Sequence, residues 1–210
     1  MAKETKQTLL DCAIDLISRQ SYGAVSVDDI CNAAWVRKGG FYHYFESKVD
    51  LLVEALEKLW NDSRADMHRA FAPSFAPAEL LANFCALAYA KQKERFEKSG
   101  KVVGCPFMTC GSELCTQEEK VRVKVEELFD RYAGYFEELL RDAQGLGITR
   151  VTNPAVGARE MFSYVTGVLS QARIKNDVDI IRRNLLPGLM RYLQAEVRQE
   201  KREALFEDAI

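Results

Sequence analysis

Residues 27–48 read VDDICNAAWVRKGGFYHYFESK, and they set the architecture of the chain. We interpret this stretch as two short helices, over 27–34 and 37–44, joined by a tight turn. Residues 4–20 place apolar side chains on one face at three- and four-residue spacing, which predicts a longer supporting helix. Two short helices behind a longer one are typical of a helix-turn-helix, whose second helix enters the major groove of DNA.

The predicted groove-binding helix carries polar residues and two glycines. Its candidate DNA-contacting residues are Arg37, Lys38, Gly39, Gly40, Tyr42 and His43. Adjacent glycines destabilise a helix by roughly 1 kcal/mol each relative to alanine. They make sense where the backbone must approach DNA closely, although the alternative is that they end a weak helix. Before the motif, Ser26 with Asp29 three residues later predicts a helix N-cap.

Residues 27–34 and 38–48 resemble the TetR/AcrR family of one-component repressors. The run Phe-Tyr-His-Tyr-Phe at 41–45, followed closely by Ser-Lys, is the most specific part of this resemblance. The resemblance covers about the first fifty residues. It implies an N-terminal head that binds double-stranded operator DNA and a C-terminal domain that binds a small-molecule effector.

The resemblance also implies roles for individual residues of the head. Tyr42 and His43 resemble a pair that contacts phosphates and bases, and Lys38 resembles a groove contact. Lys48 resembles a phosphate clamp, and Ser26 resembles the hydroxyl that meets the DNA backbone at the start of the second helix. Phosphate contacts fix the register on DNA, whereas base-edge contacts specify sequence. We expect five apolar residues to form the core of the head: Val27, Ile30, Phe41, Tyr44 and Phe45.

Two positions depart from the family pattern. The turn between the two short helices carries Trp35 where the family usually has glycine, and a tryptophan with positive φ is strained. The next helix begins near Arg37 rather than at a serine-type cap, and a lost cap costs roughly 1 kcal/mol. Arg37 can offset this loss with a phosphate contact. Both departures bear on operator sequence and affinity.

The rest of the chain also predicts helices, because apolar residues recur at helical spacing and alternating β-branched runs are missing. The expected helices cover 47–71, 78–98, 106–115, 116–145 with Thr116 as its cap, one starting at 154, and one starting at 176 or 177 and bent at Pro187. The sequence therefore predicts an all-α fold of about nine helices. A helix-turn-helix domain occupies residues 1–48, and a helical effector-binding and dimerisation domain occupies residues 49–210.

The family resemblance implies a ligand cavity among the fourth to seventh helices, a usual place for a small-molecule pocket. Candidate lining residues are Trp60, Met67, Phe71, Phe84, Cys105, Phe107, Met108, Phe129, Tyr132 and Phe136. The alternative is that these side chains simply form core, which is the commoner fate of aromatic residues at helical spacing.

The segment 103–115 resembles a Gly-Cys-x-x-x motif that opens the sixth helix in one subgroup of TetR-like regulators, some of which sense electrophiles. We expect Cys105 at or just before a helix N-terminus, where the helix dipole favours the reactive thiolate. Oxidation or alkylation of such a thiol can switch a protein. The alternative is a small, buried, inert cysteine.

A homodimer is expected through the eighth and ninth helices. The eighth carries small residues that permit close helix approach, at Gly157, Ala158, Ser163, Gly167 and Ser170. The ninth carries more apolar surface than one bundle face needs, although an ordinary intrachain core is the alternative. Two such helices from each subunit make an isologous four-helix interface. Twofold symmetry then predicts a palindromic operator.

Composition limits the other possibilities. Net charge is −2, so DNA binding must come from a local patch, with Asp11, Asp15, Asp28 and Asp29 facing away from the DNA. Six cysteines without a CxxC pair, and only two histidines, argue against a metal site. We expect no cofactor. Without a signal peptide or an apolar run of membrane-spanning length, we expect a cytoplasmic protein that does not enter a membrane.

Two rival interpretations remain open at this point. One is a helical small-molecule-binding protein whose DNA-binding head is weakened by Trp35 and Arg37. The other is a cysteine-dependent enzyme centred on Cys105, although no histidine near it in the sequence offers a base. We expect a regulator without enzymatic activity.

Overall fold

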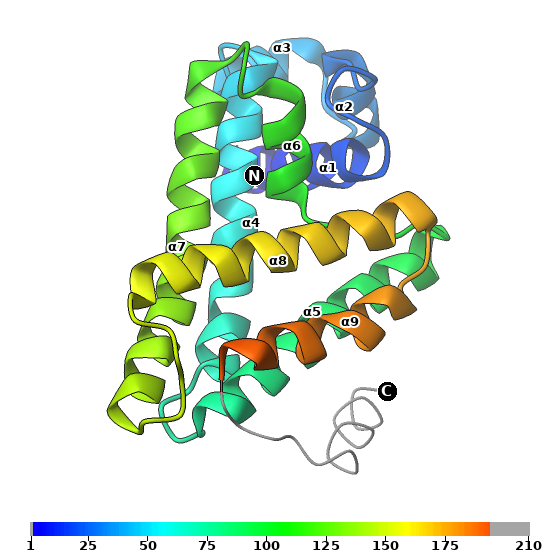
Figure 1. The fold of residues 1–210 in the computed structure, drawn as a ribbon. Helices are drawn as coiled ribbons and strands as arrows, with labels where there is room; N and C mark the ends of the chain where they lie inside the picture. Colours follow the sequence, from blue (N-terminus) through cyan, green and yellow to red (C-terminus); the bar gives the residue numbers. More distant parts are fainter. Residues whose placement is uncertain (1, 194–210) are drawn as a thin grey trace. The chain divides into compact units, whose positions relative to one another are not determined.

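The computed structural model describes residues 2–193, with side chains from residue 4 onward, and this range is all-helical (Figure 1). Its elements are α1 (Ala2–Arg19), α2 (Val27–Ala33), α3 (Lys38–Tyr44), α4 (Lys48–Ala70), α5 (Pro77–Ser99), α6 (Pro106–Leu114), α7 (Glu119–Gly145), α8 (Pro154–Lys175), α9 (Asp179–Leu189) and a short 3-10 helix, η1 (Met190–Tyr192). The predicted all-α class and the nine-helix layout are confirmed within this range. The end of the predicted second domain, 194–210, lies outside the described residues.

The chain divides into two compact units, and α4 and α7 each contribute to both. The first unit comprises Met1–Ser63 and Pro106–Leu128. In it α1, α2 and α3 pack on one another, and α6 packs on α1. The largest fully buried side chains of this unit include Leu9, Ile17, Ile30, Phe41 and Leu52. The predicted head core is present at Ile30, Phe41 and Phe45, whereas Val27 and Tyr44 are only half-buried.

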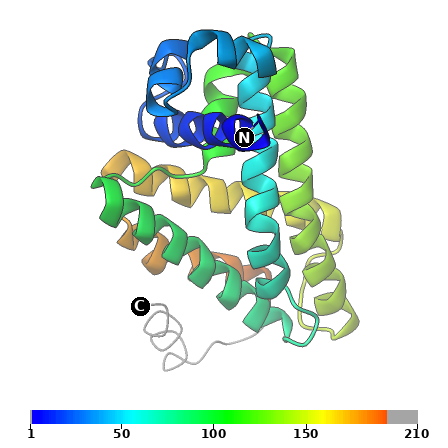
Figure 2. The ribbon, with the colours of Figure 1, turned by 180° about the vertical axis from the view of Figure 1, so that it is seen from behind.

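The second unit comprises Arg64–Cys105 and the chain from Phe129 onward. Helix α9 packs along both α5 and α8, as both views show (Figures 1 and 2). Phe136, Leu140 and Leu185 are completely buried in it. These two units combine separate stretches of the chain, whereas the predicted domains meet at one boundary between residues 48 and 49. That boundary stays a prediction.

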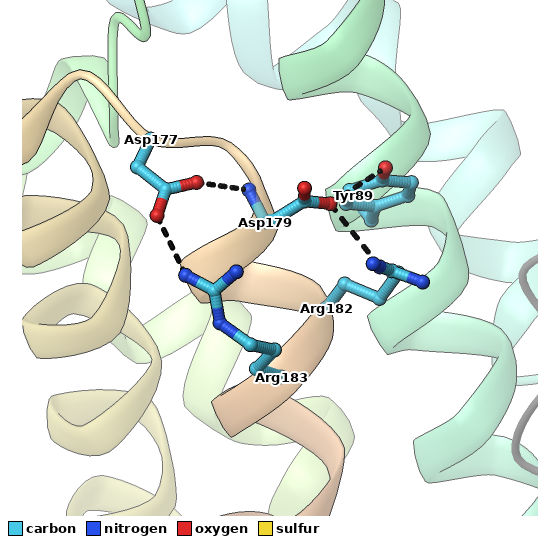
Figure 3. Close-up of polar contacts among 5 residues, drawn as sticks. All are labelled: Tyr89, Asp177, Asp179, Arg182 and Arg183. Atoms are coloured by element: carbon cyan, nitrogen blue, oxygen red, sulfur yellow. Dashed lines mark hydrogen bonds and ion pairs between the residues drawn. The ribbon is translucent and has the colours of Figure 1, made fainter.

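The turn from α8 into α9 is fixed by its backbone conformation and by polar contacts of Asp177 and Tyr89 (Figure 3). Asn176 ends α8 in the left-handed conformation at φ 48°. The Asp177 carboxylate accepts a hydrogen bond from the Asp179 backbone N–H at 2.9 Å and pairs with Arg183 at 2.6 Å. The Tyr89 hydroxyl, on α5, donates to Asp179 at 3.3 Å. These bonds anchor the start of α9 to α5.

Two helix boundaries differ from the sequence prediction. Helix α7 begins at Glu119 rather than after Thr116, because the backbone N–H groups of Gln117 and Glu118 donate back to the Leu114 carbonyl in a turn. Helix α9 begins at Asp179 rather than at 176 or 177, and it continues through Pro187 to Leu189, where η1 begins.

Candidate DNA-binding site and effector region

Helix α2 begins with a complete capping box. The Ser26 hydroxyl accepts a hydrogen bond from the Asp29 backbone N–H at 3.1 Å. In return, the Asp29 carboxylate accepts the Ser26 backbone N–H at 2.8 Å. The Ser26 hydroxyl also donates to the Asp29 carboxylate at 2.6 Å, and this bond, together with the one from the Ser26 backbone N–H, lowers the pKa of Asp29. The predicted N-cap is confirmed, and it fixes the angle at which the chain enters the helix-turn-helix.

Helix α3 has one buried and one exposed face. Phe41 is fully buried beneath it, while Lys38, Tyr42 and His43 are exposed. A Cβ atom added at Gly39 would meet nothing within 4 Å, whereas one added at Gly40 would lie 2.8 Å from the Val36 side chain. The helix continues through both glycines to Tyr44, so the alternative that they end it is wrong. Gly40 lets α3 close against the turn, and Gly39 leaves bare backbone on the surface.

The exposed end of α3 carries a replaceable ion pair. The Lys38 ammonium lies 2.9 Å from the Asp28 carboxylate of α2, and both side chains are more than half exposed. An ion pair this exposed contributes at most about 1 kcal/mol. A DNA phosphate can therefore take the place of Asp28. Asp28, an acid that we expect to face away from DNA, is thus the immediate partner of Lys38, a predicted groove contact.

The turn between α2 and α3 holds Trp35 in a strained and exposed state. Its φ is 56°, in the left-handed region that glycine prefers, as the departure from the family pattern predicted. Its side chain is 96% exposed, so no packing compensates for the strain. Arg37, at the N-cap of α3, makes no side-chain cap hydrogen bond. The strained residue and the missing cap therefore lower the stability of the head at this exposed turn.

Replacing Trp35 by glycine should stabilise the head. Relief of the left-handed strain contributes about 1 kcal/mol, reduced by the greater chain entropy of glycine in the unfolded state. The free energy of unfolding, measured by urea titration, should rise for Trp35→Gly. The control is Trp35→Ala, which keeps a Cβ atom at positive φ and should gain nothing. Equal stability of the two variants would show that the backbone conformation carries no strain.

Lys48 has a second role beside the predicted phosphate clamp. Its ammonium donates to the backbone carbonyls of Tyr22 at 2.8 Å and Val25 at 2.7 Å, and it lies 3.7 Å from the centre of the Tyr22 ring. Burial lowers the pKa of Lys48, while nearby Glu113 opposes that shift. Lys48 thus ties the start of α4 to the loop between α1 and α2.

The same loop is held from α6 by Glu113, which sequence reasoning missed. The Glu113 carboxylate accepts the backbone N–H of Tyr22 at 2.9 Å and that of Gly23 at 2.7 Å. A glutamate on a predicted helix, 90 residues away along the chain, gives no sequence signal for such a contact. The α1–α2 loop is therefore bound through its carbonyls by a cation on α4 and through its N–H groups by an anion on α6.

The predicted effector-lining residues of the second unit form two ring clusters. Phe71, Phe84 and Phe136 contact one another with ring centroids 5.1–5.7 Å apart, as the core alternative requires. Tyr132 stacks on Phe162 with centroids 5.3 Å apart, and Phe129 meets the edge of the same ring at 5.1 Å. Met67 is buried and Cys105 is 9% exposed.

The other three predicted lining residues belong to the first unit. Trp60 and Phe107 are buried, and Met108 is exposed at 36%. A groove of about 570 Å³ in this unit is lined instead by polar and charged residues of α1 and α4, among them Gln7, Glu54, Lys58 and Asp62. Whether the ten candidates line an effector site stays a prediction.

The loop between α5 and α6 is fixed by three polar side chains that sequence reasoning also missed. Buried Gln92 donates to the Gly104 carbonyl at 2.9 Å and accepts the Gly104 N–H at 3.1 Å. Arg173 donates to the Val103 carbonyl at 3.0 Å, and the Asn176 side chain accepts the Val102 N–H at 2.9 Å. Gly104 has φ 70°, where other residues are strained.

These bonds place Cys105 directly before α6, as predicted from the sequence. Helix α6 begins at the next residue, Pro106. No group of three or more His, Cys, Asp or Glu side chains suited to a metal ion occurs among the described residues. No helix in the described range has the length and apolar content to cross a membrane.

Comparison with protein-family models finds two matches in this chain. The model for bacterial regulatory proteins of the tetR family matches residues 9–55. The model for the tetracyclin repressor-like C-terminal domain matches residues 77–185. The first match contains the helix-turn-helix, and the second extends from α5 into α9.

Individual relatives agree with these matches. The chain is 28% identical over 142 residues to the transcriptional regulator AcuR of Cereibacter sphaeroides, covering 67% of this chain and 63% of that protein. It is 23% identical over 178 residues to the HTH-type transcriptional repressor NemR of Escherichia coli, covering 84% of this chain and 87% of that protein. A TetR-family regulator from Agrobacterium tumefaciens has the same fold, with a TM-score of 0.80 at 21% identity over 92% of this chain and all of that one.

Proposed function

Because this chain belongs to the TetR family of transcriptional regulators, we propose that it is a repressor, released from a palindromic operator when a small molecule enters its second unit. The family consists of regulators rather than enzymes, in agreement with the sequence prediction. One observation carries the proposal, namely the exposed face of α3. That face offers Lys38, Tyr42 and His43 beside the bare backbone of Gly39. We place the protein in the cytoplasm, where its operator is.

Within this proposal, each exposed residue of α3 has a part in binding. Lys38 exchanges Asp28 for DNA, and Tyr42 with His43 contacts phosphates and base edges. Gly39 permits close approach of the helix backbone, and Arg37 adds a phosphate contact. Ser26 meets the DNA backbone at the start of α2, and Lys48 stays near the phosphates while bracing the loop behind them.

A homodimer brings two copies of α3 to the DNA, and helix α8 supports it better than α9. Most of the apolar residues expected to give the ninth helix its surplus surface are buried within the chain at 0–8% exposure: Ile180, Ile181, Leu185, Leu186 and Leu189 in α9, with Met190 and Leu193 after it. Tyr192 is half-buried. This burial supports the alternative of an ordinary core for α9. Helix α8 keeps an exposed stripe with Val156, Ser163, Gly167 and Ile174 at helical spacing. We propose this stripe as the centre of the dimer interface.

Release from DNA works through the α1–α2 loop, which Lys48 of α4 and Glu113 of α6 both bind. The chain passes directly from Cys105 into α6, and α6 holds the α1–α2 loop through Glu113. An effector that shifts the α5–α6 loop or α4 then changes how the head is held. By linkage, the effector must bind the DNA-incompetent state more tightly. An electrophile that modifies Cys105 is one such effector, provided it reaches a thiol that is 9% exposed.

Selection of binding sites from random duplex DNA tests the proposal. The full chain should enrich a palindrome with half-sites about one helical turn or a multiple of it apart. Failure to enrich any sequence, together with no binding at low salt, would favour the helical small-molecule-binding protein with a weakened head.

Replacing Glu113 by alanine should loosen the head. The variant loses two hydrogen bonds to a charged acceptor, worth about 2 kcal/mol together at this partly exposed site. Hydrogen exchange of the Tyr22 and Gly23 amides should accelerate by about tenfold or more, because each loses its acceptor. Ser112→Ala is the control, since that hydroxyl donates only within α6, to Met108. Unchanged protection of both amides in Glu113→Ala would contradict the proposed link.

A further inference from the structure

The guanidinium of Arg95, on α5, is a positive charge without a partner among the described residues. Its side chain is partly buried, and it forms neither a hydrogen bond nor an ion pair there. The adjacent Glu94 attracts this charge but forms no ion pair with it, because the Lys98 ammonium holds the Glu94 carboxylate at 2.5 Å. Burial lowers the pKa of Arg95, although a guanidinium keeps its proton in proteins. Within the described residues, this partly buried charge therefore has no hydrogen-bonded counter-ion.

Two more exposed arginines of the same unit have partners. Arg183 pairs with Asp177 at 2.6 Å, and Arg182 pairs with Asp179 at 3.1 Å (Figure 3). Both side chains are about half exposed, where water already solvates the charge. Arg95 is less exposed than they are, and yet no residue from 4 to 193 forms an ion pair with it. A buried charge without a partner is destabilising, so its presence points to a partner that arrives from outside.

The surroundings of Arg95 indicate the kind of partner. Its electrostatic neighbours are the Glu94 carboxylate, the Cys105 thiol and the Tyr132 hydroxyl. Gln92, one turn earlier on α5, fixes the backbone of Gly104 and so the position of Cys105. Tyr132 stacks flat on Phe162, with an angle of 9° between the rings. A guanidinium group beside aromatic rings suits a planar molecule with a carboxylate, because guanidinium binds carboxylate through two parallel hydrogen bonds.

We propose that Arg95 is the anion-binding residue of the effector site, and that the effector is a small planar organic carboxylate. The inference rests on the proposed function, since it names the ligand class that the regulator senses. Arg95 binds the carboxylate, and the rings of Phe129, Tyr132 and Phe162 contact the planar part of the ligand. A ligand bound there lies next to the loop that leads into α6.

Matched acid and amide probes test the ligand class. Benzoate and cinnamate carry the charge, whereas benzamide and cinnamamide have nearly the same shape without it. With millimolar probe, the melting temperature of the full chain should rise for the carboxylates and stay unchanged for the amides. Equal shifts for acid and amide, or no shift with either carboxylate, would overturn the proposal.

Variants of Arg95 give a readout that needs no ligand. Arg95→Met removes a partly buried charge that has no bonded counter-ion among the described residues. Without probe, the melting temperature of this variant should therefore be higher than that of the wild type. The carboxylate concentration needed for a given rise in melting temperature should increase at least tenfold in Arg95→Met. The increase should be smaller in Arg95→Lys. The control is Lys175→Met, at an exposed position in the last turn of α8, which also removes one positive charge and should respond like the wild type. A lower melting temperature for Arg95→Met would show that Arg95 has a structural partner, and the proposal would fail.

Operator binding separates this inference from the proposed function. It is measured on the wild type without any probe. Intact operator binding with no carboxylate response overturns the ligand class alone. Absence of operator binding overturns the proposed function, whatever the melting temperatures show.

Discussion

Replacing Gly167 by arginine is expected to give a folded monomer that binds operator DNA only weakly. A Cβ atom at Gly167 meets nothing within 4 Å in its own chain, so the variant should fold as the wild type does. In a dimer built on the exposed stripe of α8, the same position faces the partner, and a charged side chain there prevents close approach. Loss of the second head removes the avidity of two linked half-site contacts, which lowers operator affinity by about 100-fold or more.

Sedimentation velocity and operator titration measure the two effects of this change. Gly145→Arg is the matched control, because it too adds arginine at a glycine with open space around it, but at the end of α7. The control should remain a dimer with wild-type affinity. A Gly167→Arg variant that sediments as a dimer would remove α8 from the interface.

Replacing Lys38 by methionine is expected to weaken operator binding by about 10–100-fold, as loss of a good groove or phosphate contact does. The fold should be unaffected, because the lost ion pair with Asp28 is exposed. Asp28→Asn should act in the opposite direction, since it removes an acid beside the DNA and frees Lys38. Lys98→Met, on α5, controls for the loss of one positive charge elsewhere on the chain.

The dependence of binding on salt distinguishes the two kinds of contact that Lys38 can make. A phosphate contact predicts weaker binding to all sequences and a salt slope reduced by about one. A base contact predicts relaxed specificity at one position of the operator. Wild-type affinity for Lys38→Met would mean that α3 does not lie in the groove as proposed.

Local sequence signals predicted the head well. Ser26 and Asp29 stand three residues apart, and that spacing alone specifies a capping box. Trp35 occupies a turn position that requires positive φ, so its strain followed from the motif and its φ of 56° agrees. These features depend on neighbours within a few residues, which is why one sequence is enough to find them.

Contacts between distant segments were not predictable in the same way. Glu113 holds a loop 90 residues earlier in the chain, and Gln92 holds Gly104 through backbone groups that any sequence offers. The apolar residues of α9 look the same in sequence whether they face a partner or their own chain, and the fold buries them internally. Partial burial of Arg95 without a bonded partner among the described residues is a property of the packed structure, which the sequence does not reveal.

Chemical methylation of the operator measures the central claim most directly, because guanine N7 lies in the major groove and adenine N3 in the minor groove. With the full chain bound to its selected palindrome, guanine N7 should be protected within each of two half-sites, and protection should be lost with Gly167→Arg. Protection confined to adenine N3, or none at all on a bound duplex, would contradict a regulator that reads the major groove with α3.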